Sequence, residues 1–247
     1  MTRKPPTEKN MADINEEIPE GIKEEIRRKK AFIFDMDGTI VDLEQLNYRG
    51  YADTLKKFFN IDLSNDDYQR FFSGKRTKEG FDGVLADRKV SEYDVDELIS
   101  DFRKGKRYNL ENHPDEVIKL KDGVPDLLHF LKNRCYPTCL ATSSVREFAT
   151  LILKHFDLEK LFDFTLTAED VSEGKPSPQI YNIAVERVGV DKQEAVVFED
   201  SRNGIASAKS AGILCVGVLT EGLNDSYVNS ADFVIRDFTK ILSFLKK

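Results

Sequence analysis

Two aspartates stand two residues apart where a short apolar run of the sequence ends. The run Ala31–Phe34 is followed by Asp35, Met36, Asp37, Gly38 and Thr39. In an extended chain the two carboxylates point the same way, and a glycine lets the chain turn directly after them. Carboxylates this close repel each other unless a cation or a proton lies between them. The pair indicates either a reactive site, with one acid as nucleophile or ligand and the other handling protons, or an Asx turn that closes a strand.

A second acidic pair, Glu199-Asp200, follows another apolar run, Val196–Phe198. If the two runs are neighbouring parallel strands, their carboxyl ends meet at one edge of the sheet, and Asp35, Asp37 and Asp200 come together there. Carboxylate oxygens suit Mg²⁺, which usually keeps several waters and also binds phosphate oxygens. The acids therefore predict a Mg²⁺ site.

Two further polar groups follow apolar runs. Thr142, Ser143 and Ser144 come directly after Pro137–Ala141, where hydroxyls and backbone amides can bind phosphate oxygens or simply cap a helix. Lys175 lies in a short loop that contains two prolines. Held rigidly in this loop, Lys175 would neutralise charge on a phosphate and on a nucleophile. The alternative is a lysine that is only solvated, as most isolated loop lysines are.

The remaining sequence predicts the elements that position these groups. Apolar runs of strand length, without strict polar alternation, are typical of strands buried on both faces. Helical segments lie between most of them: a short one at Ile22–Lys30, Val124–Asn133, one that Ser177 caps with Pro178 as first residue and Gly189 as stop, and Ser201–Ala211 before Gly212. This alternation predicts an α/β fold, a doubly wound, Rossmann-like parallel sheet. Its expected strands are Ala31–Phe34, Thr138–Ala141, Phe164–Leu166, Ala195–Phe198, Leu214–Val218 and Phe233–Ile235.

Residues 44 to about 118 interrupt this alternation with helical patterns and no convincing strand. The expected helices are Tyr51–Phe59, Asn65–Phe72, Lys78–Leu85 and Asp94–Tyr108. We therefore expect a loose N-terminal tail at 1–20, a core of residues 21–43 and 119–247, and an inserted all-helical cap domain at 44–118.

The order of acid pair, hydroxyl, lysine and acid pair resembles the haloacid dehalogenase superfamily over about residues 31–237. Thr142 follows Asp37 by 105 residues but Lys175 follows Thr142 by only 33, which resembles the helical-cap branch with β-phosphoglucomutase and sugar-phosphate phosphatases. The resemblance implies Asp35 as nucleophile, Asp37 as general acid and base, and Thr142 and Lys175 as ligands of the phosphate oxygens. It also implies Mg²⁺ held by the Asp35 carboxylate, the Asp37 backbone carbonyl and Asp200, with Glu199 close by.

The resemblance implies a Mg²⁺-dependent phosphatase that hydrolyses a small phosphorylated metabolite, a sugar or polyol phosphate, through an aspartyl-phosphate. A phosphosugar mutase is the alternative, although β-phosphoglucomutase has a histidine where this chain has Leu46-Asn47-Tyr48, and usually valine at the position of Thr39. A non-catalytic phosphometabolite-binding or regulatory protein is the alternative from another class. The intact set of motif residues argues against it.

Residues 74–80 resemble the substrate-specificity loop of such caps. Lys75 and Arg76 in this loop would hold a second phosphate or a sugar acid, or would belong to a solvated turn. Gly38, Thr39, Ser143 and Ser144 complete the predicted substrate-binding set.

Composition limits the partners. The net charge of −7 argues against general binding to nucleic acid or anionic membranes. The basic run 27–30 is either the C-terminal end of a helix, where cations offset the helix dipole, or a local patch that binds nucleic acid. The chain has no apolar run of membrane-spanning length and its N-terminus lacks a secretory pattern, so we expect a cytoplasmic protein, a monomer or a dimer. The three cysteines are expected to be reduced and packed as small hydrophobes.

Overall fold

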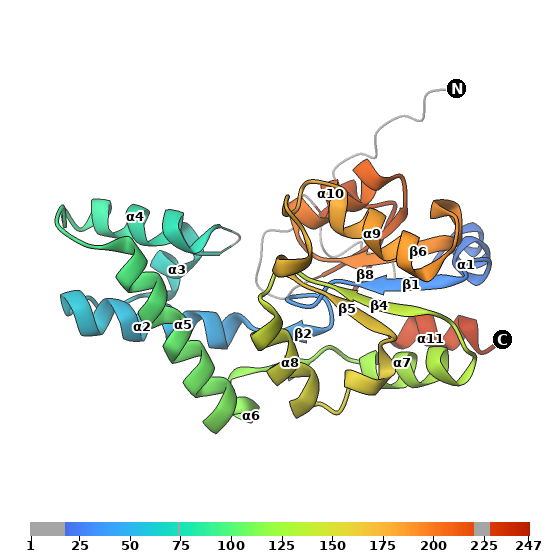
Figure 1. The fold of residues 1–247 in the computed structure, drawn as a ribbon, viewed down its shortest axis with the longest axis horizontal. Helices are drawn as coiled ribbons and strands as arrows, with labels where there is room; N and C mark the ends of the chain where they lie inside the picture. Colours follow the sequence, from blue (N-terminus) through green and yellow to red (C-terminus); the bar gives the residue numbers. More distant parts are fainter. Residues whose placement is uncertain (1–17, 74, 220–227) are drawn as a thin grey trace.

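Six parallel strands form the central sheet of the protein, in a computed structural model that describes residues 18–73, 75–219 and 228–247 (Figure 1). The strand order is β5-β4-β1-β6-β7-β8, so β1 lies between β4 and β6. The sequence predicted all six strands, and only β6 extends one residue further than expected. Most of the predicted N-terminal tail, residues 1–17, lies outside the described residues. The strands are β1 (Ala31–Phe34), β4 (Thr138–Ala141), β5 (Phe164–Leu166), β6 (Ala195–Glu199), β7 (Leu214–Val218) and β8 (Phe233–Ile235).

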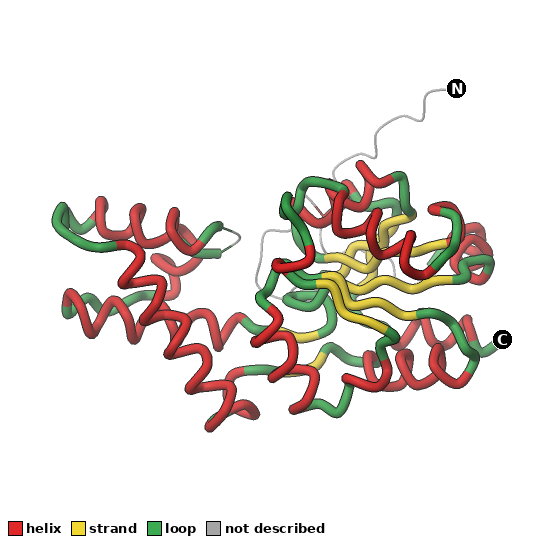
Figure 2. Tube along the Cα trace, viewed as in Figure 1, coloured by secondary structure: helices red, strands yellow, loops and turns green. Residues whose placement is uncertain are grey.

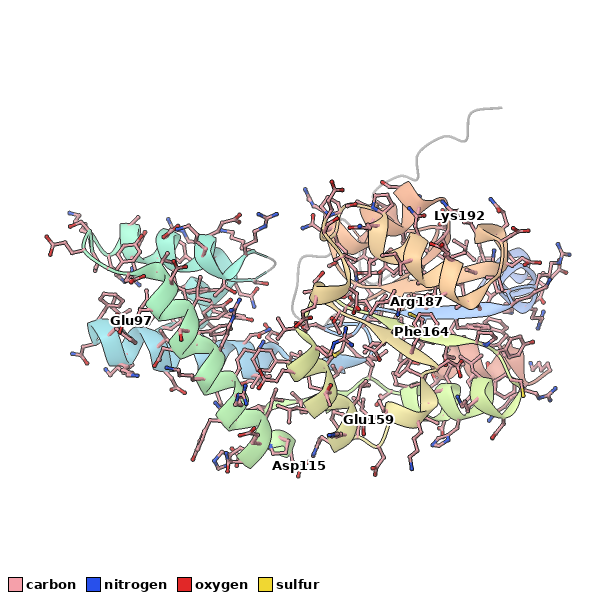
Figure 3. The ribbon with its side chains drawn as sticks, in the orientation of Figure 1. Glu97, Asp115, Glu159, Phe164, Arg187 and Lys192 are labelled. Atoms are coloured by element: carbon pink, nitrogen blue, oxygen red, sulfur yellow. The ribbon has the colours of Figure 1, made fainter. Side chains whose placement is uncertain are left out.

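Helices cover both faces of this sheet (Figure 2). Alternate side chains of each strand point to opposite faces: Phe34 and Phe198 pack with α1, α7, α8 and α11, whereas Ile33 and Val197 pack with α9 and α10. At the edge strand β5, the guanidinium of Arg187 in α9 lies 5.9 Å from the centre of the Phe164 ring (Figure 3). The predicted doubly wound α/β fold is confirmed. The helices are α1 (Glu20–Arg27), α7 (Val124–Asn133), α8 (Arg146–His155), α9 (Gln179–Val188), α10 (Arg202–Ala211) and α11 (Thr239–Leu245).

Capping residues next to these helices determine where several of them begin and end. Ser201 caps α10, accepting a hydrogen bond from the Gly204 amide, and Gly189 and Gly212 end α9 and α10 at φ +76°. The predicted cap at Ser177 is wrong by one residue, because Pro178 holds the N-cap position. The Ser177 hydroxyl still accepts from the Gln179 amide at 3.4 Å. Helix α1 begins before the expected Ile22 and ends at Arg27.

A second group of helices stands apart from the sheet and forms the inserted cap (Figure 1). Its apolar cluster is separate from the two beside the sheet and centres on Tyr51, whose ring stacks on Phe72 at 4.0 Å and on Phe102 at 4.2 Å. Helix α2 begins seven residues before the expected Tyr51. Its N-cap residue is Leu43, and the Asp42 carboxylate just before it accepts from the amide of Glu44, the first helical residue. The cap helices are α2 (Glu44–Phe59), α3 (Asn65–Phe71), α4 (Thr77–Asp87), α5 (Val95–Asn112) and α6 (Pro114–Val117).

A two-stranded antiparallel sheet joins the cap to the core. It pairs β2 (Val41–Asp42) with β3 (Lys119–Leu120), so the chain leaves the core and returns to it at adjacent points. The sequence did not predict these strands, since two residues are too few to show a periodic pattern. We propose the boundaries given above, 44–118 for the cap and 21–43 with 119–247 for the core.

The structure also tests the expectations for the basic run and for the three cysteines. The basic run 27–30 is a helix end in which Arg27 pairs with Glu20 and Lys30 with Glu194, while Lys29 is buried and donates to the Gln193 carbonyl. Of the three free cysteines, Cys139 and Cys215 are buried, but Cys135 is exposed, so the expectation of three packed thiols is wrong there. No helix in the described ranges is long and apolar enough to cross a membrane.

Candidate active site

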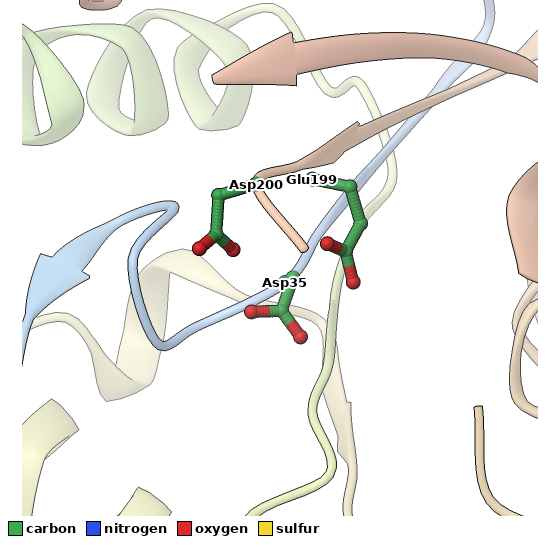
Figure 4. Close-up of side chains that lie close together, drawn as sticks. All are labelled: Asp35, Glu199 and Asp200. Atoms are coloured by element: carbon green, nitrogen blue, oxygen red, sulfur yellow. The ribbon is translucent and has the colours of Figure 1, made fainter. Parts of the chain in front are cut away.

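Three carboxylates meet where β1 and β6 end. Oxygen atoms of Asp35, Glu199 and Asp200 lie within 4.8 Å of one another (Figure 4). The register of the two strands causes this meeting: Phe34 pairs with Phe198, and the Asp35 amide donates to the Phe198 carbonyl at 3.0 Å. The structure thus brings together three of the four residues predicted to hold metal.

Lys175 connects three strand ends at this cluster. Its buried ammonium donates to Asp35 Oδ1 at 2.5 Å, to Glu199 Oε1 at 2.7 Å and to the carbonyl of Ala141 in β4 at 3.0 Å. Burial alone would lower the pKa of Lys175, but the two carboxylates raise it above its usual value. The lysine is therefore a permanent cation in contact with the predicted nucleophile.

Glu199 is fully buried and its oxygens already have several partners. Oε1 accepts from Lys175 and from the Tyr181 hydroxyl at 3.1 Å, and Oε2 accepts from the Ser201 amide and hydroxyl at 2.8 and 3.0 Å. A Cβ on Gly204 would lie 1.6 Å from Oε1, so only glycine fits there. In this arrangement Glu199 fixes Lys175 and the start of α10.

Asp200 is held from the turn after β1. Thr39 is fully buried and donates to Asp200 Oδ1 at 3.0 Å. Gly38 has φ +80°, and a Cβ there would lie 2.0 Å from Asp200 Oδ2. Gly38 lines the cavity described below, but Thr39, which was also predicted to bind substrate, is buried and is not among the residues that line it.

The carboxylate of Asp37 is outside the three-acid cluster and faces the cap. It is hydrogen-bonded to the side chain of Asn47, whose Oδ1 accepts from Lys106 at 2.8 Å. Burial raises the pKa of Asp37, and the Lys106 charge and the Asn47 hydrogen bond oppose that rise. The ammonium of Lys106 lies 5.4 Å from the Phe102 ring of its own helix and 5.2 Å from the Phe148 ring of α8.

No role was predicted from the sequence for Asn47 or Lys106. One signal was present: Lys106 follows Phe102 and precedes Leu110 by four residues each, so it stands on the buried stripe of α5. A lysine on an apolar stripe indicates a partnered or functional cation.

Burial and mutual repulsion act on the acids of the cluster. Burial, together with Glu199 and Asp37, raises the pKa of Asp35 to about 7 despite the Lys175 charge. Burial raises the pKa of Asp200 well above its usual value, and the charges of Glu199 and Asp35 add to the effect. A divalent cation among these oxygens would relieve the repulsion, and an oxygen-only donor set fits Mg²⁺.

A cavity of about 1140 Å³ opens above the acids, between core and cap. Thr142, Ser143 and Ser144 line it. Thr142 Oγ1 accepts from the Ser144 amide at 3.0 Å, a contact of the kind that a hydroxyl makes at the start of a helix. Lys75 and Arg76 line it from the cap side. Lys75 donates to the Arg70 carbonyl at 2.6 Å, so its ammonium already has one partner.

The site offers a phosphate-sized anion a buried lysine, hydroxyls and backbone amides around a carboxylate. These are the groups that phosphoryl-transfer enzymes use. Residues 32–218 match the family model of the haloacid dehalogenase-like hydrolases, and the chain belongs to this family. The predicted family resemblance is thereby confirmed.

Individual relatives cover most of the chain. It is 33% identical over 199 residues to the phosphorylated carbohydrates phosphatase of Thermotoga maritima, covering 79% of this chain and 88% of the relative. It is 34% identical over 215 residues to the validoxylamine A 7'-phosphate phosphatase of Streptomyces hygroscopicus subsp. limoneus, covering 86% and 95%. A crystal structure from Thermotoga maritima, provisionally named a β-phosphoglucomutase, superposes with a TM-score of 0.73 at 31% identity over 88% of this chain and 98% of that one.

Proposed function

We propose that this chain is a Mg²⁺-dependent phosphatase that hydrolyses a small phosphorylated metabolite, a sugar or polyol phosphate, through an aspartyl-phosphate on Asp35. The observation that carries the proposal is the contact of Lys175 with Asp35 Oδ1 and Glu199 Oε1 below a cavity lined by Thr142 and Ser144. The relatives named as phosphatases of phosphorylated carbohydrates and of validoxylamine A 7'-phosphate support it.

In the first step the phosphoryl group is transferred to Asp35, and each residue of the site has one role. Lys175 occupies Asp35 Oδ1, which leaves Oδ2 to attack the phosphorus in line. The bond between phosphorus and the ester oxygen breaks, and Asp37 gives its proton to the leaving alcohol. Thr142, the backbone amides after it and Lys175 bind the remaining phosphate oxygens. Asp35, Asp200 and the Asp37 backbone carbonyl, with Glu199 close by, would hold Mg²⁺, which would neutralise charge on the phosphate.

The second step returns the enzyme to its starting state. Asp37, now ionised, takes a proton from a water molecule, whose oxygen attacks the phosphorus and releases Asp35. A raised pKa suits both roles of Asp37, since it must carry the proton before the first step and recover it in the second. The cap excludes bulk water while the phosphoryl group is transferred.

Hydrolysis is favoured over the mutase alternative by Asn47. This side chain contacts Asp37 through an amide, which orients the carboxyl group but cannot exchange a proton with a sugar hydroxyl.

The test is hydrolysis of p-nitrophenyl phosphate with Mg²⁺, followed by a panel of sugar phosphates, polyol phosphates and pyrophosphate. Rapid quenching with ³²P-labelled substrate should trap an acid-stable, hydroxylamine-sensitive phosphoenzyme in the wild type and none in Asp35→Asn. Conversion of β-glucose 1-phosphate to glucose 6-phosphate without phosphate release would establish the mutase instead. Absence of both activities would leave the non-catalytic alternative.

A further inference from the structure

The side chain of Tyr68 in α3 is buried, yet its hydroxyl makes no hydrogen bond with any residue that the structure describes. Only 6% of the residue is exposed, and it lines the cavity between core and cap. The neighbouring hydroxyls do have partners: that of Tyr48 donates to the Leu63 carbonyl at 2.7 Å, and that of Tyr51 contacts Thr77 Oγ1 at 3.3 Å. The hydroxyl of a buried tyrosine usually has a partner. The cavity is therefore where a partner for Tyr68 would bind.

Other aromatic rings of the cap hold the ring of Tyr68 in place. Its centre lies 5.5 Å from that of Tyr48, in a T-shaped contact, and 6.3 Å from those of Tyr51 and Phe72. Because the ring is packed on several sides, the hydroxyl is ordered before a ligand arrives. A hydrogen bond to an ordered group costs less side-chain entropy than one to a mobile group.

Carboxylates surround the Tyr68 hydroxyl. Burial raises the pKa of Tyr68, and the negative charges of Glu44, Asp37 and Asp42 add to the effect. Charges act strongly only over short distances, so these carboxylates lie near the hydroxyl. All three acids also line the cavity. The hydroxyl thus stays protonated, as a donor, on a part of the cavity wall that is rich in acceptor oxygens.

Two of these acids keep an oxygen for a ligand. Asp42 Oδ1 accepts from the Glu44 amide at 2.8 Å, and Glu44 Oε1 accepts from the Gln69 side chain at 2.9 Å. Within the described residues, the second oxygen of each carboxylate makes no hydrogen bond and neither forms an ion pair. Hydroxyl groups, which both donate and accept, fit such a wall, whereas its negative charge repels a second anion.

We propose that the Tyr68 hydroxyl binds a hydroxyl group in the organic part of the substrate, beside the free oxygens of Asp42 and Glu44, and thereby selects phosphate esters of uncharged polyols. The inference rests on the proposed function, because it takes the acid cluster as the site of the phosphate. It assigns this recognition to α3 and the start of α2, outside residues 74–80. The sequence motifs did not indicate Tyr68.

The experiment compares polyol phosphates with alkyl phosphates of the same chain length, which lack the hydroxyl groups. The pairs are glycerol 3-phosphate with propyl phosphate and sorbitol 6-phosphate with hexyl phosphate. Each probe competes with p-nitrophenyl phosphate, so it counts whether or not it is hydrolysed. The proteins are the wild type, Tyr68→Phe and, as matched control, Tyr93→Phe. The Tyr93 hydroxyl donates to Asp82 at 2.9 Å, and Tyr93 is not among the residues that line the cavity.

We expect at least one polyol phosphate to have a lower inhibition constant than its alkyl partner in the wild type. Tyr68→Phe keeps the ring and removes only the hydroxyl, so it should reduce this difference by about two- to tenfold, the usual value of one neutral hydrogen bond. Tyr93→Phe should preserve the difference. A wild type that shows no preference in either pair overturns the inference. A preference that Tyr68→Phe leaves intact, including an equal loss of binding for both members of a pair, also overturns it.

A protein that hydrolyses neither p-nitrophenyl phosphate nor any probe would contradict the proposed function rather than the role of Tyr68. The rise in melting temperature that each probe causes then replaces inhibition. A larger rise with the polyol members that shrinks in Tyr68→Phe supports the role of Tyr68. Equal rises within both pairs, or a difference that persists in Tyr68→Phe, refute it.

Discussion

The acid cluster should make the metal-free protein less stable than a variant that lacks one of its charges. The pKa of Asp35 is raised from 3.8 to about 7 by burial and by neighbouring carboxylates. Between these two values the folded state binds more protons than the unfolded state, so the free energy of unfolding falls as the pH rises through this window. Above it, the ionised carboxylate is disfavoured by up to about 4 kcal/mol relative to a neutral one.

Asp35→Asn keeps the shape and a hydrogen-bond acceptor for Lys175 but cannot ionise. In chelator at pH 8, the variant should therefore be the more stable protein, with a melting temperature up to about 8–16 °C higher. At pH 4 the two proteins should melt alike, because Asp35 is then neutral in the folded wild type. Saturating Mg²⁺ should stabilise the wild type more than the variant, since the variant lacks one charged ligand.

Thermal melts of both proteins at pH 4, 6 and 8, with EDTA or Mg²⁺, provide the test. A variant that is less stable than the wild type in EDTA at pH 8 would refute the reasoning. The attraction between Lys175 and Asp35 would then outweigh burial and repulsion.

Three further predictions address the chemistry and the packing. Hydrolysis of p-nitrophenyl phosphate should stop in EDTA and return with Mg²⁺; full activity in excess chelator would exclude the proposed metal site. Asp37→Asn should lower kcat by about 10²–10⁴-fold, the usual contribution of general acid–base catalysis, and an unchanged rate would assign the proton to another group. Gly204→Ala should reduce both activity and melting temperature, because its Cβ displaces Glu199 and with it Lys175, whereas Gly105→Ala, which meets open space in α5, should be neutral or stabilising. Equal effects of the two alanines would mean that the Glu199 contact is not the cause.

The sequence predicted the sheet and the meeting of Asp35 and Asp200, because parallel strands bring their carboxyl ends to one edge. It also predicted the Asp37 carboxylate there, whereas the third acid of the cluster is Glu199. It could not predict β2 and β3, which are too short for a pattern. The early start of α2 was not predicted either, because the contact of the Asp42 carboxylate with the Glu44 amide leaves no periodic signal. The contact between Asn47 and Lys106 was also hidden, since it joins residues 59 positions apart on two helices whose packing no local pattern specifies. The contact of Thr39 with Asp200 depends on the shape of one turn.

The pairing of β2 with β3 has a consequence for how this protein can change over generations. Because β2 and β3 are paired, the cap is one long loop between two adjacent points of the core. The entropy lost on closing such a loop rises only slowly with its length. The cap also has its own apolar cluster, separate from the clusters beside the sheet. The cap residues Leu46, Leu110 and Val117 belong to a cluster beside the sheet and connect the cap to the core. Substitutions within the separate cluster of the cap do not involve this contact, so they leave the register of β1 and β6 untouched. The acid cluster can be inherited unchanged while cap residues that line the cavity are replaced.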